Sequence, residues 1–438
     1  MNSGQDDKNR GSGDILVSKC NVISSNGKQL KEISEKAWNT IIYTESMGLL
    51  QGDTQFISGE IIINDRINIF NEMALVGDEV VELKFQTPQK KGIDFVGRVY
   101  NVSLSRPNKD TKLIHLKFCS AEKVVADQLK INRAYRQVPY SDIAKDIFVP
   151  LNVIDKKKIY AEPTKNMGNL IINNKSPISV MNDLTKVSRS TQYLGANYVF
   201  FEQSDGIFQF TSIENLVDPT KVSPSIGYTV DVPSGEKNNL RNLIGLKQYK
   251  VIALPNIISN IQNGVYASTL VSNDLMKRKV TYNTFNYDET YSDFKSVNFN
   301  EVSGYGQAKT SLTNNKNYSQ RNSGHIKFVP KHYGSFETEK NYNDEREESE
   351  LIRNSQLRQI NAIRMQIVVS GDSQRRVGEV IELKIPTTED TGGRFDEILS
   401  GRYLVSKVKH VISSELNGYN TSMEVVKDSF ATPLPTKA

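Results

Sequence analysis

The sequence lacks any apolar run long enough to cross a membrane as a helix. No stretch of about 18 consecutive apolar residues occurs in its 438 residues. The first 13 residues are polar and rich in Gly, Ser and Asp, without the apolar segment that a signal peptide needs. We therefore expect neither membrane insertion nor export by a signal peptide.

Cysteine and histidine are also scarce. The two cysteines, Cys20 and Cys119, lie in strand-like segments and could in principle meet, but two thiols define no disulfide framework and no Cys-x-x-Cys occurs. We interpret both as buried thiols. The four histidines stand more than four residues apart, at His115, His325, His332 and His410. This spacing provides no zinc motif, and we predict no metal and no cofactor.

Catalytic motifs are missing as well. Neither Gly-x-Ser-x-Gly nor a cysteine-nucleophile signature occurs. Gly304-Tyr305-Gly306 begins like a dinucleotide fingerprint, but Lys309 stands at the third glycine position. A carboxylate pair far apart in the chain, as in lysozyme-like hydrolases, stays open. No stretch resembles a cell-wall hydrolase, so we predict a protein that is not an enzyme.

Charge of both signs is present in nearly equal amounts. The chain has 55 Lys and Arg against 50 Asp and Glu, a net charge of +5. Two short basic runs, Lys156 to Lys158 and Lys277 to Lys279, lack the interleaved aromatics of a base-stacking surface. We expect solvated faces there and no specific DNA binding, although a pore that merely passes DNA needs none.

The most informative feature present is a repeat. The segment from Val76 to Phe85 reads Val-Gly-Asp-Glu-Val-Val-Glu-Leu-Lys-Phe, and the segment from Val377 to Ile385 reads Val-Gly-Glu-Val-Ile-Glu-Leu-Lys-Ile. With one residue skipped, the two nearly coincide. The repeated positions singled out are Val76, Gly77, Glu82, Leu83 and Lys84 in the first copy and Val377, Gly378, Glu382, Leu383 and Lys384 in the second.

The flanks of the repeat also correspond. A strand-like stretch precedes each copy, a Gly-Arg strand start follows it, and an alternating segment closes it. These stretches are Ile61–Ile63, Gly97-Arg98 and Leu113–Phe118 in the first copy, and Met365–Val369, Gly401-Arg402 and Thr421–Val426 in the second. The period of two predicts strands with one buried face, hence two antiparallel β-barrel or sandwich units. Chance similarity of two amphipathic strands is the alternative.

The chain between the copies has a mixed character. Residues 121–129 predict a helix, and Pro139 to Asp142 predict the start of another that runs through Phe148. Ser176-Pro177 is a stronger start signal, because Ser caps free amides and Pro suits the first helical position. Tyr198–Phe201 and Ile207–Phe210 flank a Ser-Asp-Gly turn and predict a hairpin. We expect an α+β insert.

Residues 281–343 are rich in Asn, Ser, Tyr, Gly and Lys, with little periodicity. Such a span suits a mobile loop, but its tyrosines favour a contact surface, because a tyrosine ring packs while its hydroxyl stays hydrogen-bonded. Residues 344–363 follow with acidic residues early and Arg353 and Arg358 later, the order that the helix dipole favours. We predict a helix that leads into the second copy.

Several strings resemble the central hub protein of contractile-tailed phage baseplates. They are Leu116–Glu122, Ile131–Tyr135, Pro139–Phe148, Asn197–Glu202 with Phe208–Phe210, and Tyr403–His410. The resemblance spans most of the chain, about Ile15 to Phe430. Its motifs describe strands and helix caps and contain no catalytic signature.

This resemblance implies a homotrimer in which each subunit gives two similar tail-tube-type β-barrel domains flanking α+β domains, a mainly β fold. The boundaries are a flexible N-terminus (1–13), the first barrel (14–120), the α+β insert (121–240), a β and Tyr/Asn-rich loop region (241–343), a helix with the second barrel (344–430) and a flexible C-terminus (431–438). Three chains would form a pseudo-sixfold ring in the virion, with a passage for DNA.

The partners that the resemblance implies are further copies of the chain, the tail tube, a threefold central spike and the baseplate wedges, with transient non-specific contact to DNA. The repeat strands are predicted to be equivalent and to dock on the tube. Two alternatives remain: a hub or spike component of a bacterial contractile secretion system of the VgrG kind, and a hub with cell-wall hydrolase activity.

Overall fold

The computed structural model describes residues 14–432 apart from 26–29, 35–36, 50–52, 67, 89, 108–110, 153–156, 166, 231–243, 275–277, 299, 302–324, 332–343, 388–394 and 415–417. The predicted flexible N-terminus and most of the predicted flexible C-terminus lie outside these residues. So does much of the Tyr/Asn-rich span.

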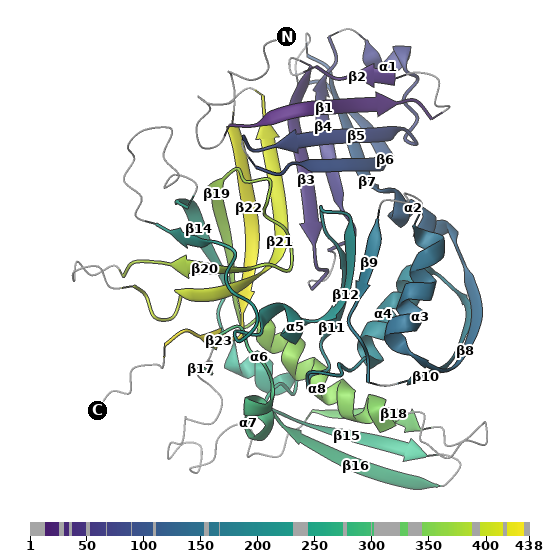
Figure 1. Cartoon of the computed structure of the whole chain (residues 1–438), viewed down its shortest axis with the longest axis vertical. Helices are drawn as coiled ribbons and strands as arrows, with labels where there is room; N and C mark the ends of the chain where they lie inside the picture. Colours follow the sequence, from purple (N-terminus) through teal and green to yellow (C-terminus); the bar gives the residue numbers. More distant parts are fainter. Residues whose placement is uncertain are drawn as a thin grey trace.

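One sheet of 13 strands forms the body of the molecule (Figure 1). The first copy supplies β1 (Leu16–Ile23), β2 (Leu30–Glu32), β3 (Trp38–Ser46), β4 (Ser58–Asn64), β5 (Val80–Gln86), β6 (Ile93–Ser105) and β7 (Leu113–Ser120). The second supplies β19 (Ile363–Ser370), β20 (Val380–Lys384), β21 (Gly401–Ser413) and β22 (Gly418–Lys427). Two strands from outside the predicted bounds 344–430 join it and are counted with the second copy from here on: β14 (Leu246–Ala253) and the short β13 (Gly227–Thr229). All pairs in it are antiparallel except β13 with β20. The mainly β fold class is confirmed.

The predicted alternation of buried and outward residues holds in both repeat strands except at Val380, which is buried beside Ile381. Leu83 and Leu383 are buried, whereas Lys84 and Lys384 are exposed. A branched apolar residue every second position packs on one pleated face and leaves the charged residues at the other. Each strand therefore turns its apolar residues to a core and its charged residues away from it.

The two copies also share details of pairing that the sequence does not display. The carbonyl of Glu79 accepts from the Val99 amide at 2.8 Å, and that of Glu379 accepts from the Val405 amide at 2.8 Å. Directly after Val99 and Val405 the long strands β6 and β21 each carry a bulge. A bulge shifts the pairing by one residue at a defined position. The two bulges therefore show which residues of β6 and β21 are equivalent.

The Gly-Arg dipeptides do not correspond as predicted. Gly97 lies within β6, where Arg98 is opposite Val80, whereas Gly401 opens β21, where Arg402 is opposite Glu382. The matched dipeptides are thus offset by two residues. An offset of two keeps every side chain on its face of the strand, so the alternation cannot reveal it.

The insert contains the predicted helices and hairpin. Its elements are α2 (Ala121–Gln128), β8 (Ile131–Pro139), α3 (Tyr140–Phe148), the 3-10 turn η2 (Val149–Leu151), β9 (Lys158–Ala161), β10 (Met167–Lys175), α4 (Pro177–Val187), β11 (Tyr198–Glu202), β12 (Ile207–Ser212) and α5 (Ile213–Val217). The Ser176 hydroxyl accepts from the Ser179 amide at 3.3 Å and caps α4, with Pro177 in its first turn. The strands β11 and β12 pair as an antiparallel hairpin.

A second small sheet lies beyond the insert at the foot of Figure 1. It consists of β15 (Ala267–Asp274), β16 (Lys279–Asn286) and β18 (Ile326–Lys331). The remaining elements are α1 (Ile69–Glu72), α6 (Ile257–Gln262), α7 (Tyr287–Thr290), η4 (Tyr291–Asp293), β17 (Asn300–Glu301), α8 (Asp344–Ile360) and β23 (Ser429–Phe430). The predicted helix α8 is confirmed; it ends three residues before Ile363, because that residue already belongs to β19. None of the helices in the described ranges combines the length and apolar character that spanning a membrane requires.

Candidate assembly interface

The two copies meet along one pair of strands, β3 of the first and β21 of the second. These strands run antiparallel, with Ser46 opposite Lys407 at one end of the pairing and Thr40 opposite Ser413 at the other. The other edge of β3 pairs with β4. We call the β3–β21 pairing and the side chains around it the junction; it makes the two copies one continuous sheet.

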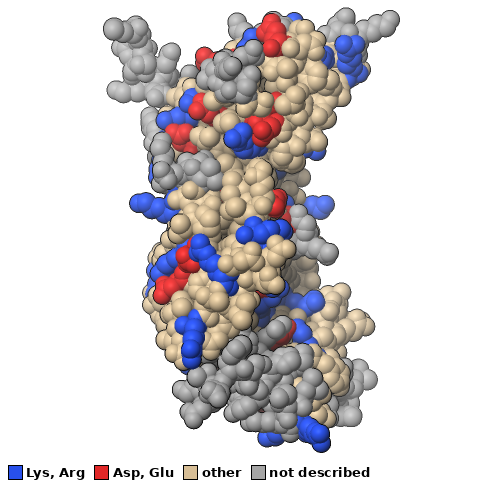
Figure 2. Space-filling model, turned by 90° about the vertical axis from the view of Figure 1, so that its right-hand side faces the viewer, with Lys and Arg blue, Asp and Glu red and all other residues tan. Residues whose placement is uncertain are grey.

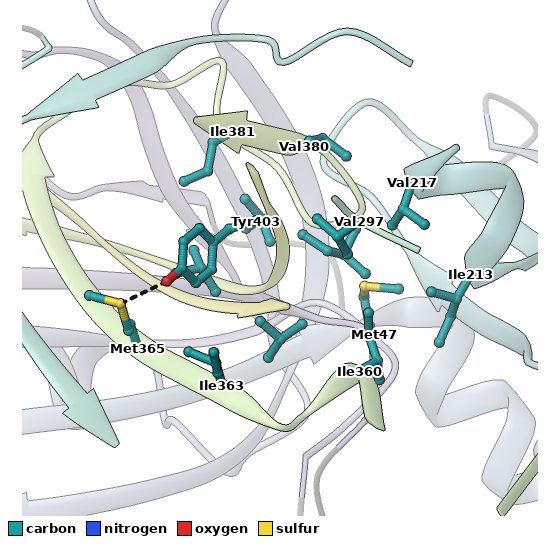
Figure 3. Close-up of a cluster of buried hydrophobic side chains, with 14 of the residues drawn as sticks. Met47, Ile213, Val217, Val297, Ile360, Ile363, Met365, Val380, Ile381 and Tyr403 are labelled. Atoms are coloured by element: carbon teal, nitrogen blue, oxygen red, sulfur yellow. Dashed lines mark hydrogen bonds between the residues drawn. The ribbon is translucent and has the colours of Figure 1, made fainter. Parts of the chain in front are cut away.

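Apolar side chains cross the junction in both directions. Met47, which follows β3, packs in the core cluster of the second copy, where Figure 3 shows it among side chains such as Ile360. Conversely, Ile412 and Tyr419 of the second copy belong to the core cluster of the first. Because each core contains residues of the other copy, we do not expect the two halves to fold as independent units.

Aromatic rings fill the centre of the junction. The ring of Tyr43 lies edge-on to Phe85 and Phe95, with ring centroids 5.7 and 5.4 Å apart, and near His410 at 6.0 Å. The His410 Nδ1 atom lies 2.8 Å from the Tyr419 hydroxyl. Burial lowers the pKa of His410 to about 4, so the imidazole is neutral at neutral pH.

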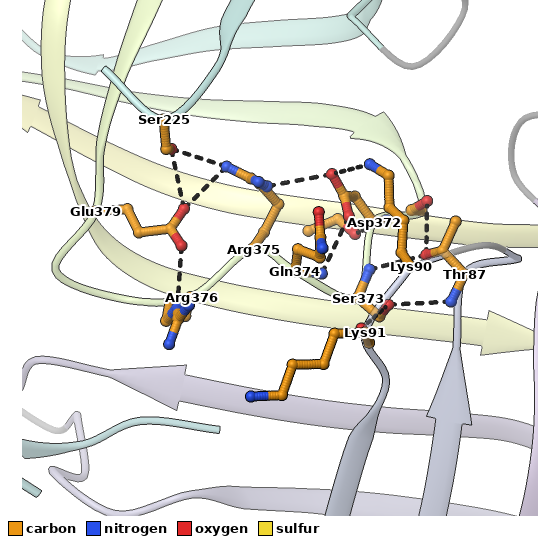
Figure 4. A network of polar contacts seen from close by, with 12 residues as sticks. Thr87, Lys90, Lys91, Ser225, Asp372, Ser373, Gln374, Arg375, Arg376 and Glu379 are labelled. Atoms are coloured by element: carbon orange, nitrogen blue, oxygen red, sulfur yellow. Dashed lines mark hydrogen bonds and ion pairs between the residues drawn. The ribbon is translucent and has the colours of Figure 1, made fainter. Parts of the chain in front are cut away.

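A polar network ties the loop after β5 to the loop after β19 (Figure 4). The Thr87 amide donates to the Ser373 hydroxyl at 3.0 Å, and the Ser373 amide donates to the Thr87 hydroxyl at 2.9 Å. Beside this reciprocal pair, Lys90 forms an ion pair of 2.8 Å with Asp372. The two loops belong to different copies, so these bonds fix the angle between the copies as well as their contact.

The same network continues into the second copy. Arg375 contacts Asp372 at 3.2 Å and Glu379 at 2.9 Å, and it donates to the Ser225 hydroxyl at 2.9 Å. Burial acts to raise the pKa of Asp372, but Arg375 and Lys90 outweigh burial and hold that pKa below its ordinary value. The buried charges are therefore paired, which is the condition under which charge is tolerated in a protein interior.

Three further ionisable groups lie on or beside β3. Lys407 forms an ion pair of 2.8 Å with Asp53. Glu45, opposite Val408 in the pairing, is fully buried, and burial raises its pKa to about 8. At neutral pH this carboxyl group is mostly protonated.

A largely buried lysine attaches the insert to the first copy. Lys157 contacts Glu202 at 2.6 Å and Glu122 at 2.5 Å, and it donates to the Ser120 hydroxyl at 2.7 Å. Both glutamates are fully buried, and Glu202 also accepts from the Ile57 amide at 3.0 Å. One ammonium group thus holds two carboxylates from different segments.

A cavity of about 580 Å³ lies where the first copy, the insert and the second copy meet. Among the charged side chains that line it, Arg376 pairs with Asp205 and with Glu379. Among the described residues, no three His, Cys, Asp or Glu side chains gather in a way that could hold a metal ion.

The residues predicted to dock on a tube are unequally accessible. The Val76 side chain is 72% exposed, whereas Val377 is fully buried in the core cluster of the second copy. The insert residue Gln203 also donates to the Val377 carbonyl, at 2.7 Å. Leu83 and Leu383 are core residues. The surface around Val76 is therefore open to a docking partner, whereas the surface around Val377 offers a partner less exposed area.

The charged members of the predicted set lie along strand faces. Glu82 forms an ion pair of 2.7 Å with Lys19 of β1, and Glu382 lies 3.8 Å from Lys384. Lys84 is exposed, and Gly77 and Gly378 have positive φ angles of 96° and 82°. A tube-docking role for these residues stays a prediction.

Sequence reasoning missed the junction itself. The one signal for the junction in the sequence is the alternation of Val408, His410 and Ile412. This alternation places the histidine on the apolar side of a strand. A neutral, buried histidine follows from that pattern, but the partner strand β3 does not, because pairing between distant strands leaves no local mark in the sequence.

Figure 2 shows basic and acidic side chains interspersed over the described part of the face bearing the insert. No broad region of one sign dominates that face.

Comparisons with known proteins identify the fold. No protein-family model matches the chain, and no curated protein matches it in sequence. A tail protein from Neisseria meningitidis has a similar structure, with a TM-score of 0.53 and 9% identity over 94% of this chain and 96% of that one. The 43 kDa tail protein of prophage MuSo2 from Shewanella oneidensis also has a TM-score of 0.53, with 11% identity over 94% of this chain and 99% of that one.

A third similar structure comes from the Francisella PdpA–VgrG complex. Its TM-score is 0.50 and its identity 9%, over 97% of this chain, which spans 59% of the matched chain. The resemblance drawn from the sequence is thus confirmed at the level of fold: the chain has the fold shared by phage tail proteins and by a chain of a VgrG complex.

Proposed function

We propose that this chain is a structural hub of a phage tail baseplate, in which three copies form a ring of six similar modules. The observation that carries the proposal is the junction: two copies of one β module already stand side by side in one chain and share one sheet. A contact that joins two similar modules side by side can be repeated, and repetition of such a contact gives a ring when the rotation closes.

The number of modules in the ring and its symmetry follow from the duplication. A homotrimer with two modules per chain presents six similar surfaces to a sixfold tail tube, while its true symmetry stays threefold and suits a central spike. The inserts occur once per chain, so they would mark the threefold side. A central opening could pass DNA without specific binding, in keeping with the mixed charge of the chain.

The fold similarity to a chain of the VgrG complex supports a second candidate, a hub or spike component of a bacterial contractile secretion system. Both candidates use the same trimeric ring and differ in the assembly around it. The neighbouring genes separate them: tail-tube and wedge genes favour the phage hub, and secretion-system genes favour the alternative.

We propose no catalytic activity, because the acids of the two buried networks around Lys157 and Arg375 are held in ion pairs within the fold. Release of dye from labelled peptidoglycan tests this point. Clear activity of the purified chain would contradict the structural role and favour a hub that also cleaves cell walls.

The ring is tested by the mass of the purified protein in solution. Mass photometry is expected to show particles of three times the 49.3 kDa chain, alone or after addition of a spike protein. A stable dimer would contradict the proposal, since two chains carry four modules and cannot match a sixfold tube.

A further inference from the structure

The long strands β6 and β21 occupy equivalent places, but only β21 has a partner on both sides of its C-terminal half. From Lys407 to Ser413 it pairs with β3 on one edge and β22 on the other. The equivalent half of β6, from Asn101 to Ser105, pairs with β7 alone in the described part of the chain. One edge of β6 is therefore open.

The open edge of β6 lacks the neighbour that β3 provides to β21. The strand that corresponds to β3 in the second copy is β14. In the first copy β3 lies beside β4, with Ile42 opposite Glu60; in the second, β14 lies beside β19, with Lys250 opposite Gln366. The strands β4 and β19 are equivalent, so β14 corresponds to β3. It is the last strand of the sheet, and its outer edge is open among the described residues.

Both open edges expose apolar side chains at positions that the junction buries. Leu104 of β6 is 47% exposed and Tyr249 of β14 is 40% exposed. Their equivalents in the junction, His410 and Ile41, are fully buried. Exposed strand edges with apolar side chains invite pairing with another strand, and proteins normally cover them.

We infer that the open edge of β14 in one copy of the chain pairs antiparallel with the open edge of β6 in the next copy, in the register of the junction. This inference rests on the ring proposed above and names the surface that closes it. A second copy of the chain is the fitting occupant, because it carries the strand that the internal junction shows to be complementary.

The register follows from the bulge that both long strands carry. Counted from the bulge, Ser105 of β6 is equivalent to Val411 of β21. Ile42 pairs with β4 at the position where Lys250 pairs with the equivalent strand β19, so Lys250 is equivalent to Ile42. Val411 and Ile42 are opposite each other in the junction. Ser105 of one copy is therefore expected opposite Lys250 of the next.

The two edges cannot meet within one chain. In the sheet, β19, β22, β21, β3, β4 and β7 lie between β14 and β6. Figure 1 shows β14 on the left of β19 and β6 on the right of β3. The contact is thus head-to-tail between copies, the type that generates rings.

Disulfide trapping tests the register directly. The variant carrying Ser105→Cys and Lys250→Cys places two thiols on opposed residues, whose Cα atoms lie within bridging range in antiparallel pairs. The native Cys20 and Cys119 are poor competitors, because burial raises their pKa values to about 12 and about 11. Mild oxidation is expected to give covalent dimers and trimers on non-reducing gels.

Two controls accompany this variant. Val411→Cys with Ile42→Cys places the same pair in the junction and is expected to form a bridge within one chain. Ser105→Cys with Lys247→Cys shifts one thiol by three residues, about 10 Å along the strand, and is expected to give little product.

The outcomes separate the inference from the proposed function. Trimers in mass photometry with cross-links only in the in-register variant support both. Trimers without that cross-link, or with equal yield from the shifted variant, overturn the strand pairing and leave the hub function standing. Particles that remain monomeric at every concentration, both alone and with added spike protein, and that give no cross-link overturn both.

Discussion

At the scale of single residues, paired charges in the interior hold the insert and the two copies together. Lys157 reaches two buried glutamates, and Arg375 reaches two acids across the second copy. Such groups contribute little net stability compared with apolar residues of the same size, but the loss of one partner is costly, because the other charge stays buried. These residues therefore respond strongly to single substitutions.

Lys157→Ala leaves Glu122 and Glu202 buried without their cation and is expected to lower the free energy of unfolding by roughly 3 to 5 kcal/mol. Lys158→Ala is the matched control, because its side chain is exposed one residue away, and a change within about 0.5 kcal/mol is expected. Urea denaturation followed by circular dichroism measures both. Equal effects of the two substitutions would contradict the structural role of Lys157.

Glu45 gives a prediction on pH. Its pKa in the fold is raised to about 8, so between an unfolded pKa near 4.3 and pH 8 the folded chain holds a proton that the unfolded chain has lost. The contribution of Glu45 to the free energy of unfolding is therefore complete below the unfolded pKa and is lost as pH rises through 8. Glu45→Gln mimics the protonated form. Between pH 6.5 and pH 8 this variant is expected to lose less stability than the unaltered chain, and the difference is up to roughly 2 kcal/mol.

Thermal melting of both proteins at pH 6.5 and pH 8 measures this difference. His410 does not confuse the comparison. Its folded pKa of about 4 lies below the unfolded value near 6.5, so its own loss of stability occurs as pH falls from 6.5 towards 4. The same pH dependence in both proteins would show that Glu45 is ionised in the fold.

At the scale of elements, close approach between strands near the junction depends on glycine. A Cβ atom added to Gly59 of β4 would lie 2.2 Å from the Ile42 carbonyl oxygen and 2.3 Å from the Phe118 ring. Strands β3, β4 and β7 can therefore pack in this way only while position 59 has no side chain.

Gly59→Ala is expected to cost about 1 to 3 kcal/mol of stability through overpacking. Gly227→Ala in β13 is the control, because the added Cβ would meet only ordinary contact, 3.7 Å from Glu382. Its expected change is small. Denaturation curves that show no greater loss for Gly59→Ala would mean that β4 can shift without cost.

The elements that the sequence predicted are those with local signals. Ser176-Pro177 begins α4 as predicted, since a cap acts within one turn, and the hairpin around Ser204 to Gly206 follows from its turn residues. The Gly-Arg match failed because a shift of two residues preserves the alternation of a strand. The partnership of β3 with β21 was beyond prediction, because it depends on how two distant segments pack.

At the scale of the whole molecule, the described part of the chain has two open strand edges. One is the outer edge of β14, the last strand at one end of the sheet, and the other is the C-terminal half of β6, which β5 does not reach. Within the chain the corresponding edges are paired and their side chains buried. A ring of copies would bury the exposed apolar positions of β6 and β14 and leave no open edge at either strand.

Leu104→Asp places a charge on the open edge of β6, where pairing with the next copy would bury it. The substitution is expected to shift mass photometry from trimers to monomers with little change in melting temperature, because the side chain is exposed in the single chain. Val76→Asp, at another exposed apolar position, is expected to leave the trimer intact. Loss of the trimer in both variants, or in neither, would contradict the assigned edge.

The central claim is that the duplicated module makes a sixfold-like ring from three chains. Electron microscopy of the assembled protein, viewed along the ring axis, tests it most directly, because axial class averages count the modules. We predict six similar lobes around a central opening, with three peripheral densities from the inserts. Three lobes, four lobes or an open helical filament would contradict the account.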